Sequence, residues 1–225
     1  GEYKGVANPV VQLIGRRGQP LYWDPFSNTG GNYNTAVIGK SGSGKSVFMQ
    51  ELVTSLRGTG CRTFVVDDGR SFMNTCLLQG GKFVYFAPDQ NICLNPFSLL
   101  ANKEDMEDSI EDVNLITNII KTMCFSIGQP DDFQSGVINN TVVEIIKNKG
   151  KDSTITDVKD YLSKQDDPRI KDLAVMLSKF SKGGQYEKYF EGKCNIQLDN
   201  DFITFEMAEL KDKKDLQSVV LLVLM

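Results

Sequence analysis

The sequence has no histidine among its 225 residues. This absence excludes imidazole general bases, Ser-His and Cys-His nucleophilic pairs, and metal sites with histidine ligands. An apolar run of 18 residues is also missing, and the longest strongly apolar stretch, residues 219–225, is far too short to span a bilayer. Any chemistry must therefore come from lysine, carboxylates, hydroxyls, backbone amides or a metal held by oxygen ligands.

Cysteine and positive charge are both scarce. The five cysteines are odd in number and widely spaced, with no C-x-x-C pair, which favours reduced thiols in a cytoplasmic protein over a disulfide framework or a zinc site. Lys and Arg number 25 against 29 Asp and Glu, a net charge of -4. Binding of nucleic acid through bulk positive charge is therefore disfavoured, although a local basic patch stays open.

Short apolar runs that alternate with helical patterns predict an α/β protein. Strands are expected at 10–14 and 21–23, then at 35–38, 63–66 and 83–86, with helices after the third and fourth of these runs. This alternation is typical of a parallel sheet covered on both faces. Strand character returns at 196–198 and 202–205, and a helix begins near residue 213.

A long stretch in the middle of the chain has apolar residues at helical spacing and no convincing strand, so it reads as an inserted helical subdomain. A helix start is expected at Thr156, followed by Asp157, and another at Pro168. The predicted organisation is a strand-rich opening segment (1–33), the first part of an α/β core (34–102), the helical subdomain (103–192) and a return to the core (193–225).

One motif carries chemistry: Gly39-x-x-x-x-Gly44-Lys45-Ser46 is a complete P-loop, placed after an apolar run and at the start of a helix. Its glycines let the backbone amides turn inward around phosphate oxygens, and the helix start adds its free amides. Lys45 is expected to reach the β- and γ-phosphates, and the Ser46 hydroxyl to ligate Mg²⁺. The predicted ATP-binding residues are Gly39, Lys40, Ser41, Gly42, Ser43, Gly44, Lys45, Ser46 and Val47.

A P-loop hydrolase also needs an acid at the end of a neighbouring strand. Asp67 and Asp68 follow the run 63–66, but a role in a turn or in capping the next helix fits this Asp-Asp-Gly-Arg-Ser cluster at least as well. Glu206, after the run 202–205, is the other candidate, and it also reads as an ordinary acid at a strand end. The sequence does not decide among these three residues.

Taken in order, these motifs resemble the TraC-type conjugative-transfer ATPases of type IV secretion systems. The matching segments are 34–39 leading into the P-loop; Phe64-Val65-Val66-Asp67 with Gly69-Arg70-Ser71; Leu94-Asn95-Pro96-Phe97; the run from Phe180 to Gly192 with its Gly-Gly-Gln-Tyr step; and Phe205-Glu206-Met207 with Glu209-Leu210. The resemblance runs over essentially the whole chain. The P-loop is shared by many NTPases, whereas the tyrosine-and-glycine run and the Asn-Pro-Phe step are more particular.

The resemblance implies a RecA-like P-loop NTPase sheet with an inserted all-helical subdomain. It also implies ATP hydrolysis that drives pilus assembly or substrate transfer, assembly into a ring, expected to be a hexamer, and association with an inner-membrane complex at the cytoplasmic face of the bacterial inner membrane. Partners would be other type IV secretion components, with DNA allowed but not required.

The resemblance further places the family's Asp-Glu metal and water-activating pair beyond a helix like the one that reaches Met225. We therefore expect a fragment of a larger protein that binds ATP and turns it over little, with Glu206 on an earlier strand than the main metal acid. The competing hypothesis is a DNA-pumping translocase of the FtsK, HerA or coupling-protein kind, which shares the motor fold and would differ by its response to DNA.

Overall fold

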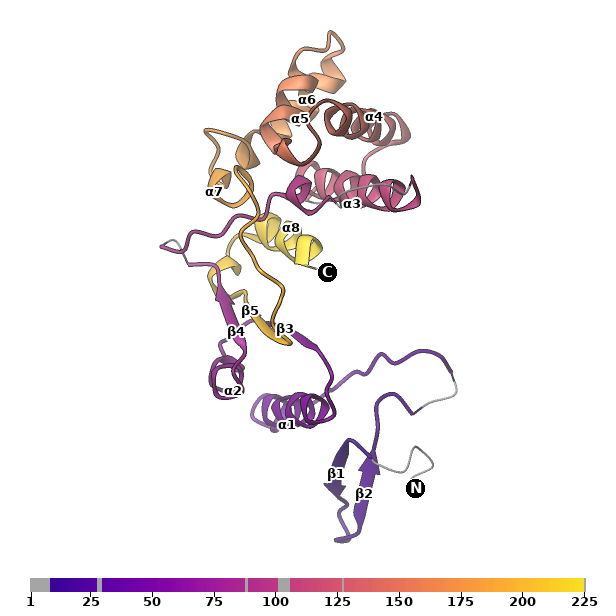
Figure 1. The fold of residues 1–225 in the computed structure, drawn as a ribbon, viewed down its shortest axis with the longest axis vertical. Coiled ribbons are helices and arrows are strands. Elements are labelled where there is room, and N and C mark those ends of the chain that lie inside the picture. The colour runs from indigo at the N-terminus through magenta and orange to yellow at the C-terminus, as the bar shows by residue number, and fades with distance from the viewer. Residues whose placement is uncertain (1–8, 28–29, 88, 101–105, 127, 225) are drawn as a thin grey trace. The chain divides into compact units, whose positions relative to one another are not determined.

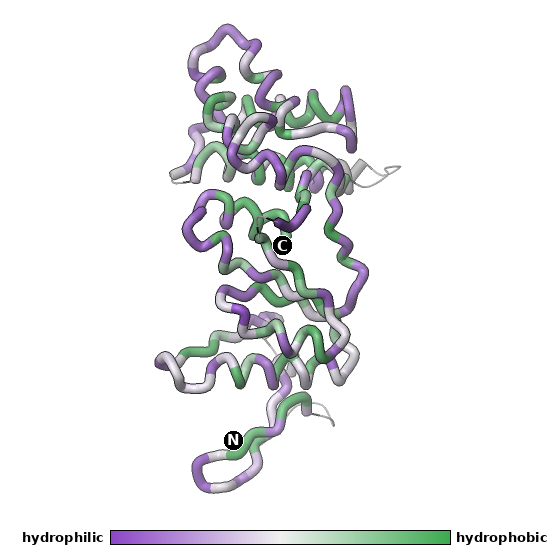
Figure 2. Tube along the Cα trace, turned by 90° about the vertical axis from the view of Figure 1, so that its left-hand side faces the viewer, coloured by the Kyte–Doolittle hydropathy of each residue, from purple (hydrophilic) through white to green (hydrophobic). Residues whose placement is uncertain are grey.

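A computed structural model describes residues 9–27, 30–87, 89–100, 106–126 and 128–224 (Figure 1). The chain divides into two compact units, each described here by itself. The first comprises Gly1–Val84 and Asp199–Glu206, and the second comprises Tyr85–Leu198 and Met207–Met225. Along the trace, hydrophobic residues recur within the helices and strands, as the amphipathic patterns require (Figure 2).

The first unit is built on a three-stranded sheet of order β3-β5-β4, formed by β3 (Thr63–Asp67), β5 (Phe202–Glu206) and β4 (Lys82–Tyr85). β3 and β5 are parallel, with Val65 opposite Thr204. All five residues of the central strand β5 are buried, whereas β3 alternates and leaves Phe64 and Val66 about half exposed. The α/β class with parallel pairing is thus confirmed.

Two helices cover one face of this sheet. Helix α1 (Lys45–Gly58) and helix α2 (Met73–Leu78) lie at the positions that the apolar periodicity predicts. Val53 of α1 and Cys76 of α2 pack with Phe72 and with Phe202 of β5 in one buried cluster. Burying these side chains removes apolar surface from water, and this holds the helices on the sheet.

The opening strands are also confirmed. Strands β1 (Val11–Ile14) and β2 (Pro20–Trp23) pair antiparallel. Trp23 of β2 stacks on Phe48 of α1, with ring centroids 6.3 Å apart. This contact joins the hairpin to the helix that follows the P-loop.

Two predicted strands are wrong. Residues 35–38 and 196–198 have an apolar, β-branched character, but in the described part of the chain neither forms a ladder with another strand. Ile38 is 93% exposed and Val37 is only partly buried, so the segment 35–38 buries little apolar surface. An extended segment becomes a strand only when a neighbour supplies its hydrogen bonds, and local sequence does not reveal that neighbour.

The second unit is mainly helical, and this confirms the helical character predicted for the middle of the chain. Its α-helices are α3 (Met106–Cys124), α4 (Asp132–Lys149), α5 (Ile155–Ser163), α6 (Pro168–Leu177), α7 (Glu187–Phe190) and α8 (Lys214–Leu224), and its 3₁₀ turns are η1 (Pro96–Leu99), η2 (Gly150–Asp152), η3 (Ser178–Phe180) and η4 (Ala208–Leu210). Helix α3 contacts α4, α6 and α8. Among the described residues, no helix is both long enough and apolar enough to cross a membrane.

Capping explains where two of these helices begin. Pro168 opens α6 as predicted, with Asp167 as the N-cap. Helix α5 begins at Ile155 rather than at Thr156, because Thr154 and Asp157 form a reciprocal capping box.

A buried asparagine holds together the two chain segments that lead into and out of the helices. The Asn95 side-chain amide donates to the carbonyls of Ser153 (2.9 Å) and Gly192 (2.8 Å), while its Oδ1 accepts from the Phe97 amide. Asn95 is 1% exposed. The Asn-Pro-Phe step therefore fixes residues that are almost a hundred positions apart.

Candidate functional site

The P-loop folds as its glycines predict. Gly42 and Gly44 have φ angles of 77° and 90°, which disfavour any residue with a Cβ. A Cβ on Gly39 would lie 2.5 Å from the Ser43 hydroxyl oxygen. Three of the glycines are thus required by the backbone path or by close approach within the loop.

Lys45 closes the loop on itself. Its ammonium donates to the carbonyls of Gly39 and Lys40, each at 2.8 Å. The group is only partly buried, and the residues from Gly39 to Gly44 are exposed. A phosphate at this position would give the ammonium an anionic partner and so a stronger, charge-assisted hydrogen bond.

The start of α1 suits an anion. Gly44 is the N-cap and supplies no side-chain acceptor, and the first turn of the helix holds no acidic residue. The first amides of an α-helix have no partner within the helix, and the helix dipole makes this end positive. The residues present therefore fit a phosphate group, which the amides of the loop and of the helix start would hold.

Asp67, the first candidate acid, stabilises the chain that leads into α2. Its carboxylate accepts from the Ser71 hydroxyl (2.8 Å) and from the Phe72 amide (3.0 Å). This is the turn and capping role that the sequence left as an alternative.

Glu206, on the neighbouring strand β5, also binds the backbone of the turn that follows β3. It is completely buried at the carboxyl end of β5, and its carboxylate accepts from the amides of Gly69 (3.1 Å) and Arg70 (2.5 Å). The register places Asp67 opposite Glu206. The structure thus brings Asp67 and Glu206 to one edge of the sheet. Asp68, the residue after Asp67, is exposed.

No group of three His, Cys, Asp or Glu side chains suited to a metal occurs in the part of the chain that the structure describes. A P-loop site does not need one, because Mg²⁺ at such sites uses one or two protein oxygens together with phosphate oxygens. The Ser46 hydroxyl, at the second position of α1, is the oxygen ligand that the motif offers.

Sequence reasoning missed the residue that joins the P-loop helix to the turn after β3. Gln50 of α1 donates from Nε2 to the Ser71 carbonyl at 2.7 Å, and its Oε1 accepts from the Thr75 hydroxyl at 3.1 Å. The available signal was a polar residue between the apolar positions Met49 and Val53 of the same helix.

Two arginines near this sheet serve as internal supports. Arg57 donates to Gln79 and to the Asp201 carbonyl, each at 2.9 Å, and lies over the Phe202 ring. Arg62 lies over the Phe64 ring, 5.0 Å from its centroid. These contacts assign both side chains to packing of the first unit.

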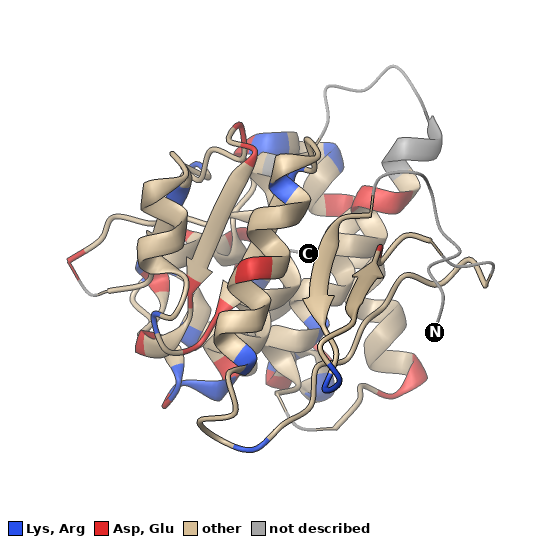
Figure 3. Ribbon diagram, turned by 90° about the horizontal axis from the view of Figure 1, so that it is seen from below, with Lys and Arg blue, Asp and Glu red and all other residues tan. Residues whose placement is uncertain are grey.

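The aromatic side chains of the tyrosine-and-glycine run (Phe180 to Gly192) form a packed core and are not presented to solvent. Tyr186, Tyr189 and Phe190 are buried, and the rings of Phe180 and Phe190 meet edge to face at 5.6 Å. Lys and Arg are interspersed with Asp and Glu along the described ribbon (Figure 3). The aromatics are thus unavailable for stacking on bases.

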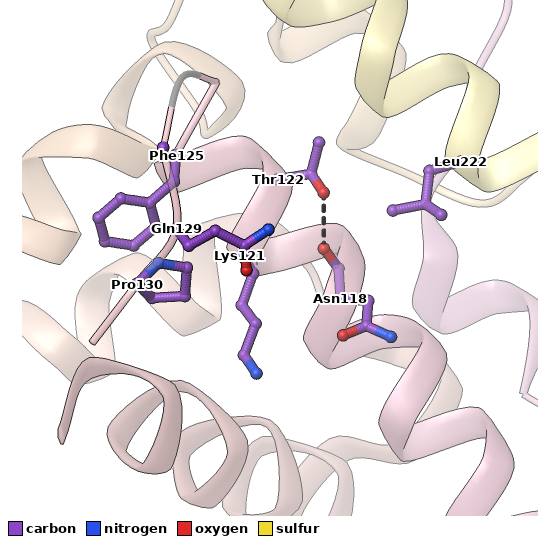
Figure 4. Close-up of a pocket in the computed structure, with 8 residues that line it drawn as sticks. Asn118, Lys121, Thr122, Phe125, Gln129, Pro130 and Leu222 are labelled. Atoms are coloured by element: carbon purple, nitrogen blue, oxygen red, sulfur yellow. Dashed lines mark hydrogen bonds between the residues drawn. The ribbon is translucent and has the colours of Figure 1, made fainter. Parts of the chain in front are cut away.

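The second unit contains a cavity of about 310 Å³ between the end of α3, the loop after it and α8 (Figure 4). Lys121 and Gln129 contribute polar groups to it, and Phe125, Pro130 and Leu222 contribute apolar ones. None of the described residues that line this cavity is acidic.

Together, the parallel sheet, the glycine loop closed by its lysine and the uncapped helix start define a P-loop NTPase domain of α/β, RecA-like fold. The sequence profile of a family described as the TraG P-loop domain matches residues 11–225. The chain belongs to this family, and P-loops of this kind bind nucleotides.

Two proteins show how this chain compares with known members. It is 26% identical over 213 residues to protein TraC of Escherichia coli strain K12, covering 89% of this chain and 23% of TraC. Its fold is similar to that of VirB4 of Thermoanaerobacter pseudethanolicus, with a TM-score of 0.79 and 18% identity over 97% of this chain and 62% of that one. The chain thus spans under a quarter of TraC and less than two thirds of the VirB4 chain.

Proposed function

We propose that this chain is the ATP-binding motor domain of a type IV secretion ATPase, which in the full-length protein powers pilus assembly and substrate transfer. The observation that carries the proposal is the loop 39–46, closed by Lys45, at the start of an uncapped helix in a member of the TraG P-loop family. The likeness to TraC over most of the chain supports the same assignment.

The residue roles follow from the geometry of the loop. The amides of residues 39–47 would hold the phosphates, Lys45 would offset negative charge at the β- and γ-phosphates, and the Ser46 hydroxyl would ligate Mg²⁺. The metal, when bound, supplies charge neutralisation at the phosphate oxygens. Lys45 is thus the catalytic residue that we assign within the chain.

We expect this chain to bind ATP and to hydrolyse it slowly. Asp67 and Glu206, the acids that end β3 and β5, have carboxylates engaged by backbone amides and by the Ser71 hydroxyl. An acid that activates water must be able to accept a proton from it, and these interactions compete with that role. The water-activating group is therefore assigned to another part of the full-length protein.

The partners and the location follow from the same assignment. We expect the full-length protein to assemble with other secretion components and with copies of itself in a ring, which we take to be a hexamer. Its place would be the bacterial cytoplasm, at the cytoplasmic face of the inner membrane, where it would contact an inner-membrane complex. DNA is allowed as a contact but not required.

The test is nucleotide binding by this chain, measured by titration calorimetry with ATP and Mg²⁺. Lys45→Ala should weaken binding at least tenfold, because the loop loses its cation. Lys171→Ala, an exposed lysine on α6, is the matched control and should bind like the parent chain. Equal binding by Lys45→Ala and the parent chain would reject the P-loop assignment.

Two further results would redirect the proposal. Rapid Mg²⁺-dependent hydrolysis that is abolished by Lys45→Ala would promote Asp67, Asp68 or Glu206 to the catalytic acid. In the full-length protein, stimulation of hydrolysis by DNA together with steeply salt-dependent DNA binding would favour a DNA-pumping translocase.

A further inference from the structure

The turn of residues 68–71, which follows β3 and is called the β3 turn below, has an unusual backbone. Arg70 has a φ of 57°. Among the described residues, every other residue with a positive φ is a glycine. The left-handed region costs an L-residue roughly 1 kcal/mol or more, and Gly69 before it has a φ of 143°. A non-glycine residue keeps such a conformation only where its surroundings fix it.

Glu206 supplies the fixing contact. Its carboxylate has no exposed surface and accepts from two consecutive amides, those of Gly69 and Arg70. Burying an ionised carboxylate is costly unless it is well hydrogen-bonded. A neutral apolar residue at the end of β5 would avoid that cost, so the carboxylate is explained by what it does to the turn.

The β3 turn is also bound to the P-loop helix. The Ser71 carbonyl accepts from Gln50 of α1 at 2.7 Å. Helical side chains lean toward the N-terminus of their helix, so the tip of Gln50 lies over the turn that precedes it. Gln50 is four residues after Ser46, a rise of about 6 Å, so the Ser71 carbonyl lies beside the first turn of α1.

Two restraints therefore act on the same turn, one from β5 and one from α1. Arg70, adjacent to Ser71, is an exposed residue at the carboxyl edge of the sheet. An extended arginine side chain is about as long as the rise of about 6 Å that separates Gln50 from Ser46 at the start of α1. The guanidinium of Arg70 is therefore long enough to reach from the β3 turn toward the P-loop. It presents planar pairs of N–H donors that match phosphate oxygens.

We propose that Arg70 contacts the terminal phosphate of the nucleotide bound at loop 39–46, and that Glu206 is the positioning residue that holds Arg70 there. The proposal rests on the proposed function, because it needs a nucleotide in the loop. Lys45 supplies a point charge from the loop, and Arg70 supplies a second cation from the sheet edge. Glu206 acts through the backbone of the β3 turn and does not touch the nucleotide.

The experiment compares the binding of ATP and ADP to the full 225-residue chain by titration calorimetry in the presence of Mg²⁺. Arg70→Gly removes the guanidinium and leaves a residue that accepts the same backbone conformation. It should weaken ATP binding about tenfold and ADP binding less than about twofold, because the lost hydrogen bonds are to a charged terminal phosphate. Arg70→Lys should recover part of the preference for ATP.

Glu206→Gln tests the positioning role. An amide side chain offers one acceptor oxygen where the carboxylate offers two, so one of the two turn amides loses its partner. We expect the same fall in the ATP-to-ADP affinity ratio as in Arg70→Gly, and no further fall in the double variant, because the two residues act as one unit. Arg62→Gln, which removes an arginine beside the amino end of β3, is the control and should leave the ratio unchanged.

The outcomes separate the two proposals. If the parent chain binds neither nucleotide, or if Lys45→Ala binds as well as the parent, the proposed function fails. If Lys45 matters but Arg70→Gly keeps the parent's ratio, the phosphate contact is overturned. If Arg70→Gly lowers the ratio and a folded Glu206→Gln does not, the positioning role is overturned. Should Glu206→Gln fail to fold, the two Arg70 variants still decide the contact.

Discussion

The Tyr186 hydroxyl donates a hydrogen bond to Oδ1 of Asp215 at 3.1 Å, and the Lys179 ammonium donates to Oδ2 of the same carboxylate. Burial of Tyr186, followed by its hydrogen bond to Asp215, raises its pKa to about 12. Partial burial opposes ionisation of Asp215, but the hydrogen bonds from Lys179, the Leu216 amide and Tyr186 together lower its pKa below 3.8. This network joins the tyrosine-and-glycine run to the start of α8.

These two shifts predict opposite pH limits for the stability of the second unit. The folded state favours ionised Asp215, so its contribution is present above about pH 4 and is lost as the pH falls through its lowered pKa. The folded state favours neutral Tyr186, so its contribution is present below about pH 10 and is lost as the pH rises toward 12. Urea unfolding at a series of pH values measures both limits.

Single variants assign each limit to its residue. Asp215→Asn should lower the free energy of unfolding by roughly 1 kcal/mol at pH 7. It should also flatten the acid side of the plot of unfolding free energy against pH. Tyr186→Phe should flatten the alkaline side of the stability profile. It should weaken the acid side only in part, because Asp215 keeps the hydrogen bonds from Lys179 and the Leu216 amide. A parent-like alkaline side in Tyr186→Phe would show that the hydrogen bond to Asp215 does not govern that limit.

The Gly-Gly step in the tyrosine-and-glycine run predicts a second effect. A Cβ on Gly184 would lie 2.2 Å from the Ser178 carbonyl oxygen and 2.7 Å from the Lys179 carbonyl carbon. Because backbone atoms cannot swing aside, Gly184→Ala should lower the free energy of unfolding by about 3 kcal/mol. Thermal and urea denaturation measure this loss.

Gly136 is the matched control for that substitution. It lies inside α4, and a Cβ there would meet nothing within 4 Å. Gly136→Ala should therefore stabilise the chain by about 0.5–1 kcal/mol, because alanine is the better helix former. Equal effects of the two substitutions would contradict the close approach seen at Gly184.

Asn95 predicts a third effect. Asn95→Ala leaves the carbonyls of Ser153 and Gly192 without the amide that satisfies them. The loss should be about 2–4 kcal/mol, because buried acceptors then lack partners. Urea unfolding of this variant beside Asn140→Ala, an exposed asparagine of α4, is the comparison. A loss no larger than that of Asn140→Ala would show that water replaces the missing amide.

Much of the local structure follows from sequence because it depends on neighbours in the chain. The helix after the P-loop, the strands 63–66 and 202–205 and the start of α6 at Pro168 come from side-chain periodicity and capping, which act over a few residues. The glycine and lysine positions of loop 39–46 likewise belong to one short motif.

The tertiary structure decided what depends on partners far away in the chain. Residues 35–38 and 196–198 have strand composition, but among the described residues they belong to neither of the two sheets. The alternatives left open for Asp67 and Glu206 turned on which amides face their carboxylates, and for Glu206 those amides lie 137 and 136 residues away. Sequence supplied the acids and the arginine, but only the parallel register of β3 and β5 brought Glu206 to Arg70, because hydrogen bonds act over about 3 Å wherever folding places the chain.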